Sequence, residues 1–359
     1  MRKKKGEGKR NLPQAFLDLD VGLDHVFCEL LRVDVAEWNA TKALWESGNA
    51  WRIREIPKKS GKRVLHIPSD PLKRMQRGIL EQVLRTFPVH RCVHGAHPKT
   101  SVVTNARVHA GFGQAFYLLD LKNAFPSVKR ERVSNYLLPK LIERICEMTD
   151  ENEKDAKKIA CAILELLHVD DVLPQGFPTS PAVLNLVALP LDREISRLLK
   201  ETSIGYEFRY TRFVDDLTIS TNRADIPSEL RDAIKKVIKK SGWTINGAKV
   251  RYHGLVEEGT EKERSAHMPV VTGLVPQLDG RVTIPRWRLD HYRGCVHRLL
   301  KLDRELTLDE HDELVGIIGF VGMVYDDKLP ANIRKPYELA RAKFNLGDRR
   351  EARHTYPED

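Results

Sequence analysis

Apolar residues recur along the chain at two spacings, and each spacing predicts a different kind of element. Between Met75 and Phe87 the apolar positions fall on one face of a helix: Ile79, Leu80, Val83, Leu84 and Phe87. The helical period also occurs in segments 14–50, 156–168, 182–199, 225–242 and 287–304. Segments 52–68, 116–120 and 210–220 are instead rich in β-branched and aromatic residues, which is typical of strands. The pattern therefore predicts a chain of mixed helices and strands.

Two of the strand-like segments contain a tight turn. Segment 52–68 carries the sequence Lys-Ser-Gly-Lys, which predicts the turn of a hairpin. In segment 210–220 two strands meet at the adjacent acids Asp215 and Asp216. Adjacent carboxylates repel each other, so they are costly to keep unless they bind a cation. Asp-Asp pairs also occur in ordinary turns, so this pair alone does not establish a metal site.

A third acid strengthens the metal interpretation. Asp120 follows a buried-looking strand that breaks at Asn123 and Pro126. A carboxylate at a strand end is a hard oxygen ligand, and three such groups could hold two Mg²⁺ ions against a triphosphate and an attacking hydroxyl. Between the acidic elements lies segment 173–181, a loop constrained by glycine and proline that leads into the apolar helix.

The order of these elements resembles the palm of reverse transcriptases. That family carries motif A with one Asp, motif B as LPQGxxxSP and motif C as (Y/F)xDD, and here the three stand at 120, 173–181 and 213–216. Segment 242–249 resembles the stretch that ends in the motif D lysine, and segment 56–63 resembles the fingers hairpin that clamps the triphosphate. Phe213 stands where Tyr is usual and Val214 where Ala is usual, which leaves processivity and fidelity open.

Two further strings are similar to those of bacterial retron reverse transcriptases. Segment 103–109 contains the NAxxH signature, and segment 271–273 is the VTG signature. They stand in the expected order, one before motif A and one after motif D. The resemblance covers roughly residues 50–345.

The resemblance implies an α+β fold, a right-hand polymerase with fingers, a ferredoxin-like palm and a helical thumb. The implied domains are a basic tail with an N-terminal helical region (1–50), fingers (51–115), a palm with part of the fingers and motifs A to E (116–285), a helical thumb (286–345) and a C-terminal tail (346–359).

The resemblance also implies site residues. Catalysis and the binding of two Mg²⁺ ions fall to Asp120, Asp215 and Asp216. Nucleotide binding falls to Arg63, Lys59, Phe125, Gln175, Gly176 and Lys249. Of these, Arg63 and Lys59, with Lys58, would contact the β- and γ-phosphates, and Lys249 would protonate the leaving pyrophosphate.

Phe125 would exclude a 2′-hydroxyl from beneath the incoming sugar, while Gln175 and Gly176 would approach the nascent base pair. Each of these residues also has a plain structural interpretation. Arg63 and Lys59 could belong to an exposed hairpin, and Lys249 could be a surface lysine. Phe125 could be a core phenylalanine, and Gln175 a turn glutamine.

The residues expected to bind RNA or primer carry similar alternatives. Asn105 and His109 could share a helix face that touches RNA, or could be a cap and a satisfied interior histidine. The VTG string Val271, Thr272 and Gly273 could form a primer-grip turn or a strand end. A basic stripe is expected on the helix 287–304, where it would contact phosphates in a polymerase thumb or remain solvated: Arg293, His297, Lys301 and Arg304.

Composition is compatible with a polyanionic partner without identifying one. The chain has 60 Lys and Arg against 50 Asp and Glu, a net charge of +10. Its 5 cysteines show no zinc-binding spacing or disulfide framework. With no apolar run or leader pattern, a bacterial cytoplasmic protein without a membrane partner is expected. The segment after 345 is too short for a ribonuclease H domain, so host ribonuclease H is expected to remove the template.

Retron resemblance implies further partners and a biological role. The implied partners are a cognate structured non-coding RNA, its RNA–DNA hybrid product, dNTPs and an effector protein. The resemblance also implies priming from an internal 2′-OH and a role in anti-phage defence. The alternatives are another bacterial reverse transcriptase, of the maturase-like, diversity-generating or abortive-infection type, or a non-catalytic RNA-binding scaffold that restrains an effector. Three intact and mutually repelling carboxylates argue against a scaffold.

Overall fold

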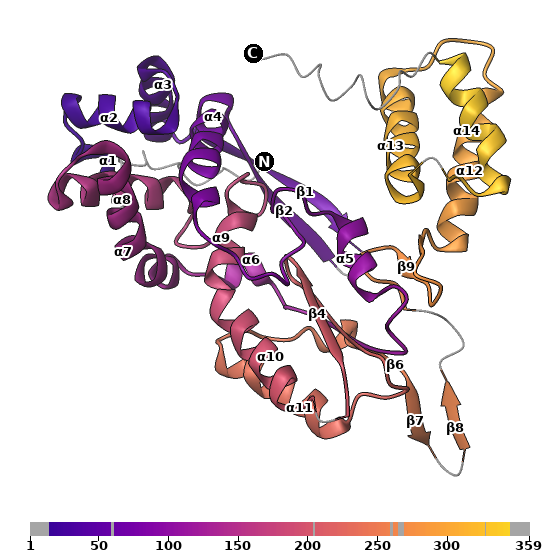
Figure 1. The fold of residues 1–359 in the computed structure, drawn as a ribbon. Helices are drawn as coiled ribbons and strands as arrows, with labels where there is room; N and C mark the ends of the chain where they lie inside the picture. The colour runs from indigo at the N-terminus through magenta and orange to yellow at the C-terminus, as the bar shows by residue number, and fades with distance from the viewer. Residues whose placement is uncertain are drawn as a thin grey trace, which may run out of the picture. The chain divides into compact units, whose positions relative to one another are not determined.

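The computed structural model describes residues 14–58, 61–203, 205–258, 261–264, 269–326 and 328–344. Figure 1 shows the fold as a ribbon coloured along the chain. The chain divides into two compact units, each made of several segments. The first unit comprises Met1–Lys99, Asp120–Glu201 and Asp232–Lys249. The second comprises Thr100–Leu119, Thr202–Arg231 and Val250–Asp359. Helices and strands are mixed in both, which confirms the expected α+β class.

The first unit is mainly helical. Its helices are α1 (Gln14–Leu17), α2 (Val21–Leu31), α3 (Val35–Glu46), α4 (Asp70–Gly78), α6 (Ala124–Ser127), α7 (Arg130–Thr149), α8 (Glu153–Leu166), α9 (Ser180–Val187), α10 (Leu189–Glu201) and most of α11 (Ser228–Lys240). Local capping explains where several begin; for example, the Asp20 carboxylate accepts a hydrogen bond from the Leu23 amide at 3.0 Å at the start of α2. Helix α8 buries Ile159 and Ile163 on its apolar face.

One antiparallel hairpin completes the first unit. Strands β1 (Trp51–Lys58) and β2 (Gly61–Pro68) pair from Trp51 opposite Pro68 to Lys58 opposite Gly61. The hairpin predicted for segment 52–68 is therefore present. Lys59 lies outside the described residues, as does the basic tail of residues 1–13.

A four-stranded sheet in the order β4-β5-β3-β6 organises the second unit. The strands are β3 (Ala115–Asp120, whose last residue groups with the first unit), β4 (Phe208–Phe213), β5 (Asp216–Thr221) and β6 (Arg251–His253). Short hairpins follow in β7 (Leu255–Glu258) with β8 (Glu261–Arg264) and in β9 (Val275–Pro276) with β10 (Val282–Thr283). The Gln114 amide donates to the Thr221 carbonyl at 2.8 Å, so the start of β3 lies beside the end of β5. These neighbouring strands therefore run antiparallel, and β3 ends at the edge of the sheet where β5 begins.

Three helices near the C-terminus share one apolar core with the sheet of the second unit. They are α12 (Arg286–Leu300), α13 (Leu308–Tyr325) and α14 (Ala331–Lys343). Their core includes Val296, Ile317 and Ile333 and continues through Val103 of α5 (Val102–His109) to Phe116 of β3. Among the described residues, no helix is long and apolar enough to cross a membrane.

The structure corrects the extent of three predicted helices. The helix expected over 75–87 is α4 followed by a π-helical turn (Ile79–Val83) and a 3₁₀ turn (Leu84–Thr86), although Ile79, Val83 and Leu84 are buried as expected. The helix expected over 182–199 is divided at Ala188 into α9 and α10. The helix expected over 287–304 ends at Leu300, so Lys301 and Arg304 lie beyond it.

A capping box explains why Arg304 is not part of the helical stripe. Thr307 and Glu310 begin α13, with the Thr307 hydroxyl accepting from the Glu310 amide and the Glu310 carboxylate accepting from the Thr307 amide at 3.0 Å. Arg304 donates two hydrogen bonds to the same carboxylate, at 2.8 and 2.9 Å. These bonds, with Arg304 the largest contributor, lower the pKa of Glu310 from 4.5 to about 2.

This lowered pKa gives a signed pH dependence. Because the folded state depresses the pKa of Glu310, its contribution to stability is present above pH 4.5 and is lost as the pH falls through about 2. Glu310→Gln is expected to lower the thermal unfolding midpoint at pH 7, and its difference from wild type should shrink below pH 4.5. Circular dichroism melts over this range measure the effect, with Glu305→Gln at an exposed neighbouring position as the control. A difference that stays constant with pH would contradict the assignment.

Candidate active site

The adjacent acids lie at a two-residue turn between β4 and β5. Phe213 pairs with Asp216, which leaves Val214 and Asp215 as the turn. Val214 has a φ of 58°, in the left-handed region. A β-branched residue is a true outlier there, and glycine usually fills the first position of such a hairpin turn. Strain of this kind typically marks a functional position.

A fully buried arginine supports this turn. Arg212 has 0% of its surface exposed, and its Nη1 donates to the Val214 carbonyl at 2.8 Å. Burying a guanidinium is costly unless its donors are used, so this contact links the position of the turn to the interior of the sheet. Arg212 was not among the site residues predicted from the sequence. An arginine between Thr211 and Phe213, two positions before the turn, was the available signal.

Asp120 lies at the end of β3 and is 5% exposed. One carboxylate oxygen accepts from Asn246 Nδ2 at 3.0 Å and the other from Lys249 Nζ at 2.5 Å. Backbone bonds hold the two segments together, since the Asn246 amide donates to the Asp120 carbonyl at 2.8 Å and the Lys122 amide to the Thr244 carbonyl at 2.7 Å. The structure therefore brings together two predicted site residues, Asp120 and Lys249, and adds Asn246, which the sequence analysis missed.

The donor set fits a divalent cation chemically. Carboxylate oxygens are the ligands that Mg²⁺ prefers, and Asp120 already pairs with a positive charge, the Lys249 ammonium. Asp120 ends β3 and Asp216 begins the antiparallel neighbour β5. Within the described part of the chain, however, no group of three or more His, Cys, Asp or Glu side chains is arranged to hold a metal ion.

The loop expected to be motif B packs against the β1–β2 hairpin of the first unit. The His66 amide of β2 donates to the Gln175 carbonyl at 2.7 Å. Gly176 has a φ of 112°, and a Cβ there would lie 2.5 Å from the His66 carbonyl oxygen. Gly176 is therefore required by its backbone angle and by the close approach of β2. The Gln175 side chain is half-buried.

Two other predicted nucleotide-binding residues lie on the first unit. Arg63 is exposed on β2, opposite Ile56. Phe125 lies on the short helix α6 and is half-buried, so it is neither a fully buried core residue nor a free surface ring.

The two signature strings contact each other inside the second unit. Asn105 and His109 are each 1% exposed. His109 bonds Ser220 Oγ at 2.7 Å through Nδ1 and Thr211 Oγ1 at 2.8 Å through Nε2, which ties α5 to β5 and β4. Asn105 Nδ2 donates to Thr272 Oγ1 at 3.2 Å. Of the alternatives left open by the sequence, the structure has the interior histidine.

The VTG string is a tight turn. Val271 and Leu274 exchange backbone hydrogen bonds, at 2.7 and 3.0 Å. Thr272 and Gly273 between them have φ values of 47° and 84°, the pattern of a type I′ turn. Val271 is buried, so the string supports the fold around Asn105.

The basic residues near α12 are exposed, but two of them are paired. Arg293 Nη2 lies 3.2 Å from Asp290 on the same helix, and Arg304 is held by Glu310. His297 and Lys301 are exposed. Trp287, which the sequence analysis did not single out, is 71% exposed at the start of α12.

One protein family and several named proteins are similar to this chain. A family described as reverse transcriptase (RNA-dependent DNA polymerase) matches residues 56–263. The chain is 30% identical to the retron Mx162 reverse transcriptase of Myxococcus xanthus over 329 residues, covering 86% of this chain and 65% of that protein, less than two thirds of its length. It is 30% identical to the retron Ec73 reverse transcriptase of Escherichia coli over 278 residues, covering 77% of this chain and 82% of that protein. The solved structure of apo telomerase from Candida tropicalis superposes with a TM-score of 0.45 at 12% identity, covering 80% of this chain and 57% of that one.

The strain at Val214 can be measured with a matched pair of variants. Val214→Gly and Val214→Ala both remove the two γ-methyl groups, but only glycine adopts a φ of 58° without steric cost. Val214→Gly is expected to exceed Val214→Ala in free energy of unfolding by about 1 kcal/mol. Urea unfolding of the two variants provides the comparison. Equal stability, or a more stable alanine variant, would remove the argument from strain.

Proposed function

Because the chain belongs to the reverse transcriptase (RNA-dependent DNA polymerase) family and, within it, to the retron reverse transcriptases, we propose that it copies part of a cognate structured non-coding RNA into DNA. The observation that carries this proposal is the placement of the acids. Asp120 ends β3, Asp215 lies in the turn that precedes β5, and Asp216 begins that antiparallel neighbour.

Asp120, Asp215 and Asp216 are the residues we assign to two Mg²⁺ ions. When bound, such ions lower the pKa of the attacking hydroxyl and neutralise charge on the departing pyrophosphate. Asn246 holds one Asp120 oxygen and so fixes the orientation of that carboxylate. Lys249 Nζ, which pairs with Asp120 in this structure, is the proton donor we assign to the pyrophosphate.

The first unit supplies the other proposed nucleotide contacts. The exposed guanidinium of Arg63, with Lys59 four residues earlier in the sequence, would bind the β- and γ-phosphates. The loop of Gln175 and Gly176, fixed against β2, would form one wall of the nucleotide site. The half-buried ring of Phe125 would lie beneath the incoming sugar and exclude a 2′-hydroxyl.

Similarity to retron enzymes supports the remaining proposals. We propose priming from an internal 2′-OH, a branched RNA–DNA hybrid, removal of template by host ribonuclease H, and a role in anti-phage defence with an effector protein. Exposed His297, Lys301 and Arg293 would contact RNA phosphates. Buried Asn105 and His109 would instead maintain the fold from which such contacts are made.

Removing the paired carboxylates should abolish polymerisation without abolishing RNA binding. Asp215→Asn with Asp216→Asn removes the charge that would hold the cations, and cDNA synthesis is expected to fall by roughly a thousandfold or more. Primer extension and RNA affinity are measured on the same preparations.

The chain offers a matched control for this double variant. Asp170 and Asp171 are also adjacent acids in a tight turn between Val169 and Val172, with φ values of 47° and 64°. Asp170→Asn with Asp171→Asn should leave extension within a few-fold of wild type. If the two double variants lose activity equally, or if neither does, the assignment of Asp215 and Asp216 is wrong.

Sugar selection should depend on Phe125. Phe125→Val opens space beneath the sugar and is expected to raise ribonucleotide incorporation relative to deoxynucleotide incorporation by about tenfold or more, since one steric contact of this kind is worth about 1–3 kcal/mol. Single-nucleotide kinetics give the ratio. Phe112→Val, at another half-buried phenylalanine in the second unit, is the control for a general loss of packing in the protein. An unchanged ratio in folded Phe125→Val protein would make Phe125 a packing residue.

A further inference from the structure

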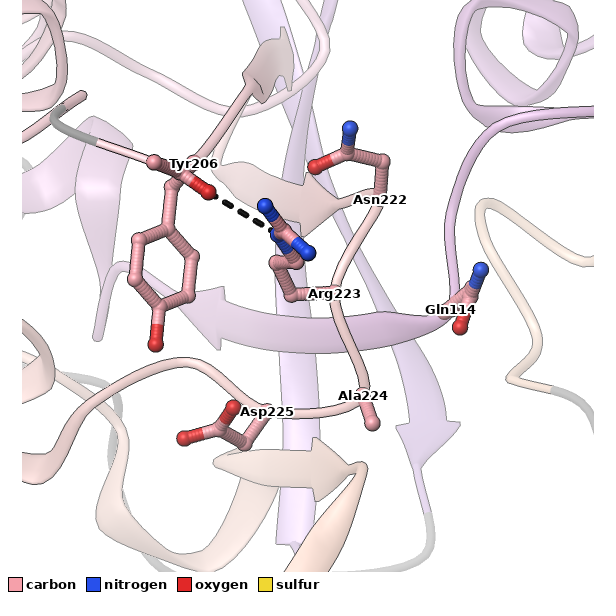
Figure 2. A pocket seen from close by; sticks show the side chains of 7 residues that line it. Gln114, Tyr206, Asn222, Arg223, Ala224 and Asp225 are labelled. Atoms are coloured by element: carbon pink, nitrogen blue, oxygen red, sulfur yellow. Dashed lines mark hydrogen bonds between the residues drawn. The ribbon is translucent and has the colours of Figure 1, made fainter.

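An open hollow of about 570 Å³ lies in the second unit, away from the acidic turn (Figure 2). It is lined by residues before β4, residues after β5 and one residue before β3: Gly205, Tyr206, Asn222, Arg223, Ala224, Asp225 and Gln114. Because Val214 and Asp215 connect β4 to β5, the hollow lies at the other end of that hairpin. Its volume is within the range of small-molecule sites.

Hydrogen bonds between side chains and the backbone fix the walls of the hollow. Arg223 Nε donates to the Gly205 carbonyl at 2.8 Å, and the Glu207 amide donates to Asn222 Oδ1 at 3.2 Å. At the residue after Asp225, the Ile226 amide donates to the Tyr252 hydroxyl at 3.0 Å. These bonds hold the segment before β4 and the segment after β5 in place, and they leave some polar groups of both segments without a hydrogen bond.

Several hydrogen-bonding groups at the hollow remain available. Within the described part of the chain, the Nη groups of Arg223, the Nδ2 of Asn222 and the carboxylate of Asp225 make no hydrogen bond. Figure 2 shows Tyr206, Arg223 and Asp225 gathered around the hollow, with Gln114 on its other side. The Tyr206 ring is half-buried and stacks on Phe208, with ring centroids 5.6 Å apart and planes 5° from parallel.

This combination selects a flat ligand with both donors and acceptors. A phosphate would meet the Asp225 carboxylate, which repels it, and an aliphatic ligand would leave Arg223 and Asp225 unsatisfied. A nucleobase offers a face for an aromatic ring and edges that carry donors and acceptors.

We propose that the hollow binds an unpaired guanine base. A carboxylate can accept from N1–H and the 2-amino group of guanine together, while an arginine donates to O6 and N7. Adenine would instead present its N1 acceptor to the Asp225 carboxylate. The site is separate from the polymerase centre and does not depend on branching or defence. Unpaired bases of a structured RNA and free guanine nucleotides are both possible sources of the base.

Short single-stranded RNAs test the base preference. The probes are an oligouridine with one central guanosine, the same RNA with adenosine, and the same RNA with inosine, which lacks the 2-amino group. Wild-type protein is expected to bind the guanosine RNA about tenfold more tightly than the adenosine RNA, with inosine between them. Asp225→Asn should reduce this preference to less than about threefold, whereas Glu207→Gln, an equal change of charge at an exposed neighbour, should retain it.

Fluorescence anisotropy gives the affinities, and GMP competition identifies the source of the base. Displacement of the guanosine RNA by GMP, but not by AMP, indicates a site that also accepts the free nucleotide; no displacement indicates that the base must be part of RNA. Equal wild-type affinity for the guanosine and adenosine RNAs would overturn the proposal, and so would an unchanged preference in folded Asp225→Asn protein. Extension of a primed template by wild type, measured in parallel, tests the polymerase proposal separately, because these binding measurements need no catalysis.

Discussion

A carboxylate shielded from water must be balanced by hydrogen-bond donors or a positive charge, and this electrostatic constraint shapes the proposed active centre. Asp120 is 5% exposed, and Lys249 and Asn246 together use both of its oxygens. At the acidic turn the backbone is constrained instead. Val214 is held in a left-handed conformation, and its carbonyl accepts a hydrogen bond from the buried Arg212. Each acidic element thus has a cationic residue close at hand in its own unit. Keeping Asp120 in this buried position therefore requires specific partners, as expected for a carboxylate that the protein uses.

The sequence predicted strands correctly where the residue types of the strand and its turn are sufficient to identify a hairpin. Alternating β-branched and aromatic residues on both sides of Asp215 and Asp216 predicted β4 and β5, and the Lys-Ser-Gly-Lys turn predicted the hairpin of β1 and β2. The ends of helices were less predictable. The apolar period continued past Leu300, but the capping box at Thr307 started a new helix and drew Arg304 toward Glu310.

Residues that act through long-range contacts were the least accessible to sequence reasoning. The sequence left Asn105 and His109 as RNA contacts or as a cap and an interior histidine, and Thr272 as part of a primer-grip turn or a strand end. Only the fold shows that Asn105 meets Thr272 while His109 bridges β4 and β5. Arg212 and Asn246 gave little local signal because their partners are a turn carbonyl and a distant carboxylate. Adjacent acids alone would also have pointed to Asp170 and Asp171, so the surrounding motif order was needed to choose Asp215 and Asp216.

The central claim is that this chain is a metal-dependent polymerase rather than an RNA-binding scaffold. The most direct measurement is extension of a recessed DNA primer on an RNA template by the wild-type protein as the Mg²⁺ concentration is varied, with RNA binding followed in the same samples. We expect no extension without Mg²⁺ and a rate that rises more steeply than the first power of Mg²⁺ concentration, as two cooperating ions require. RNA binding without extension at any Mg²⁺ or Mn²⁺ concentration would contradict it.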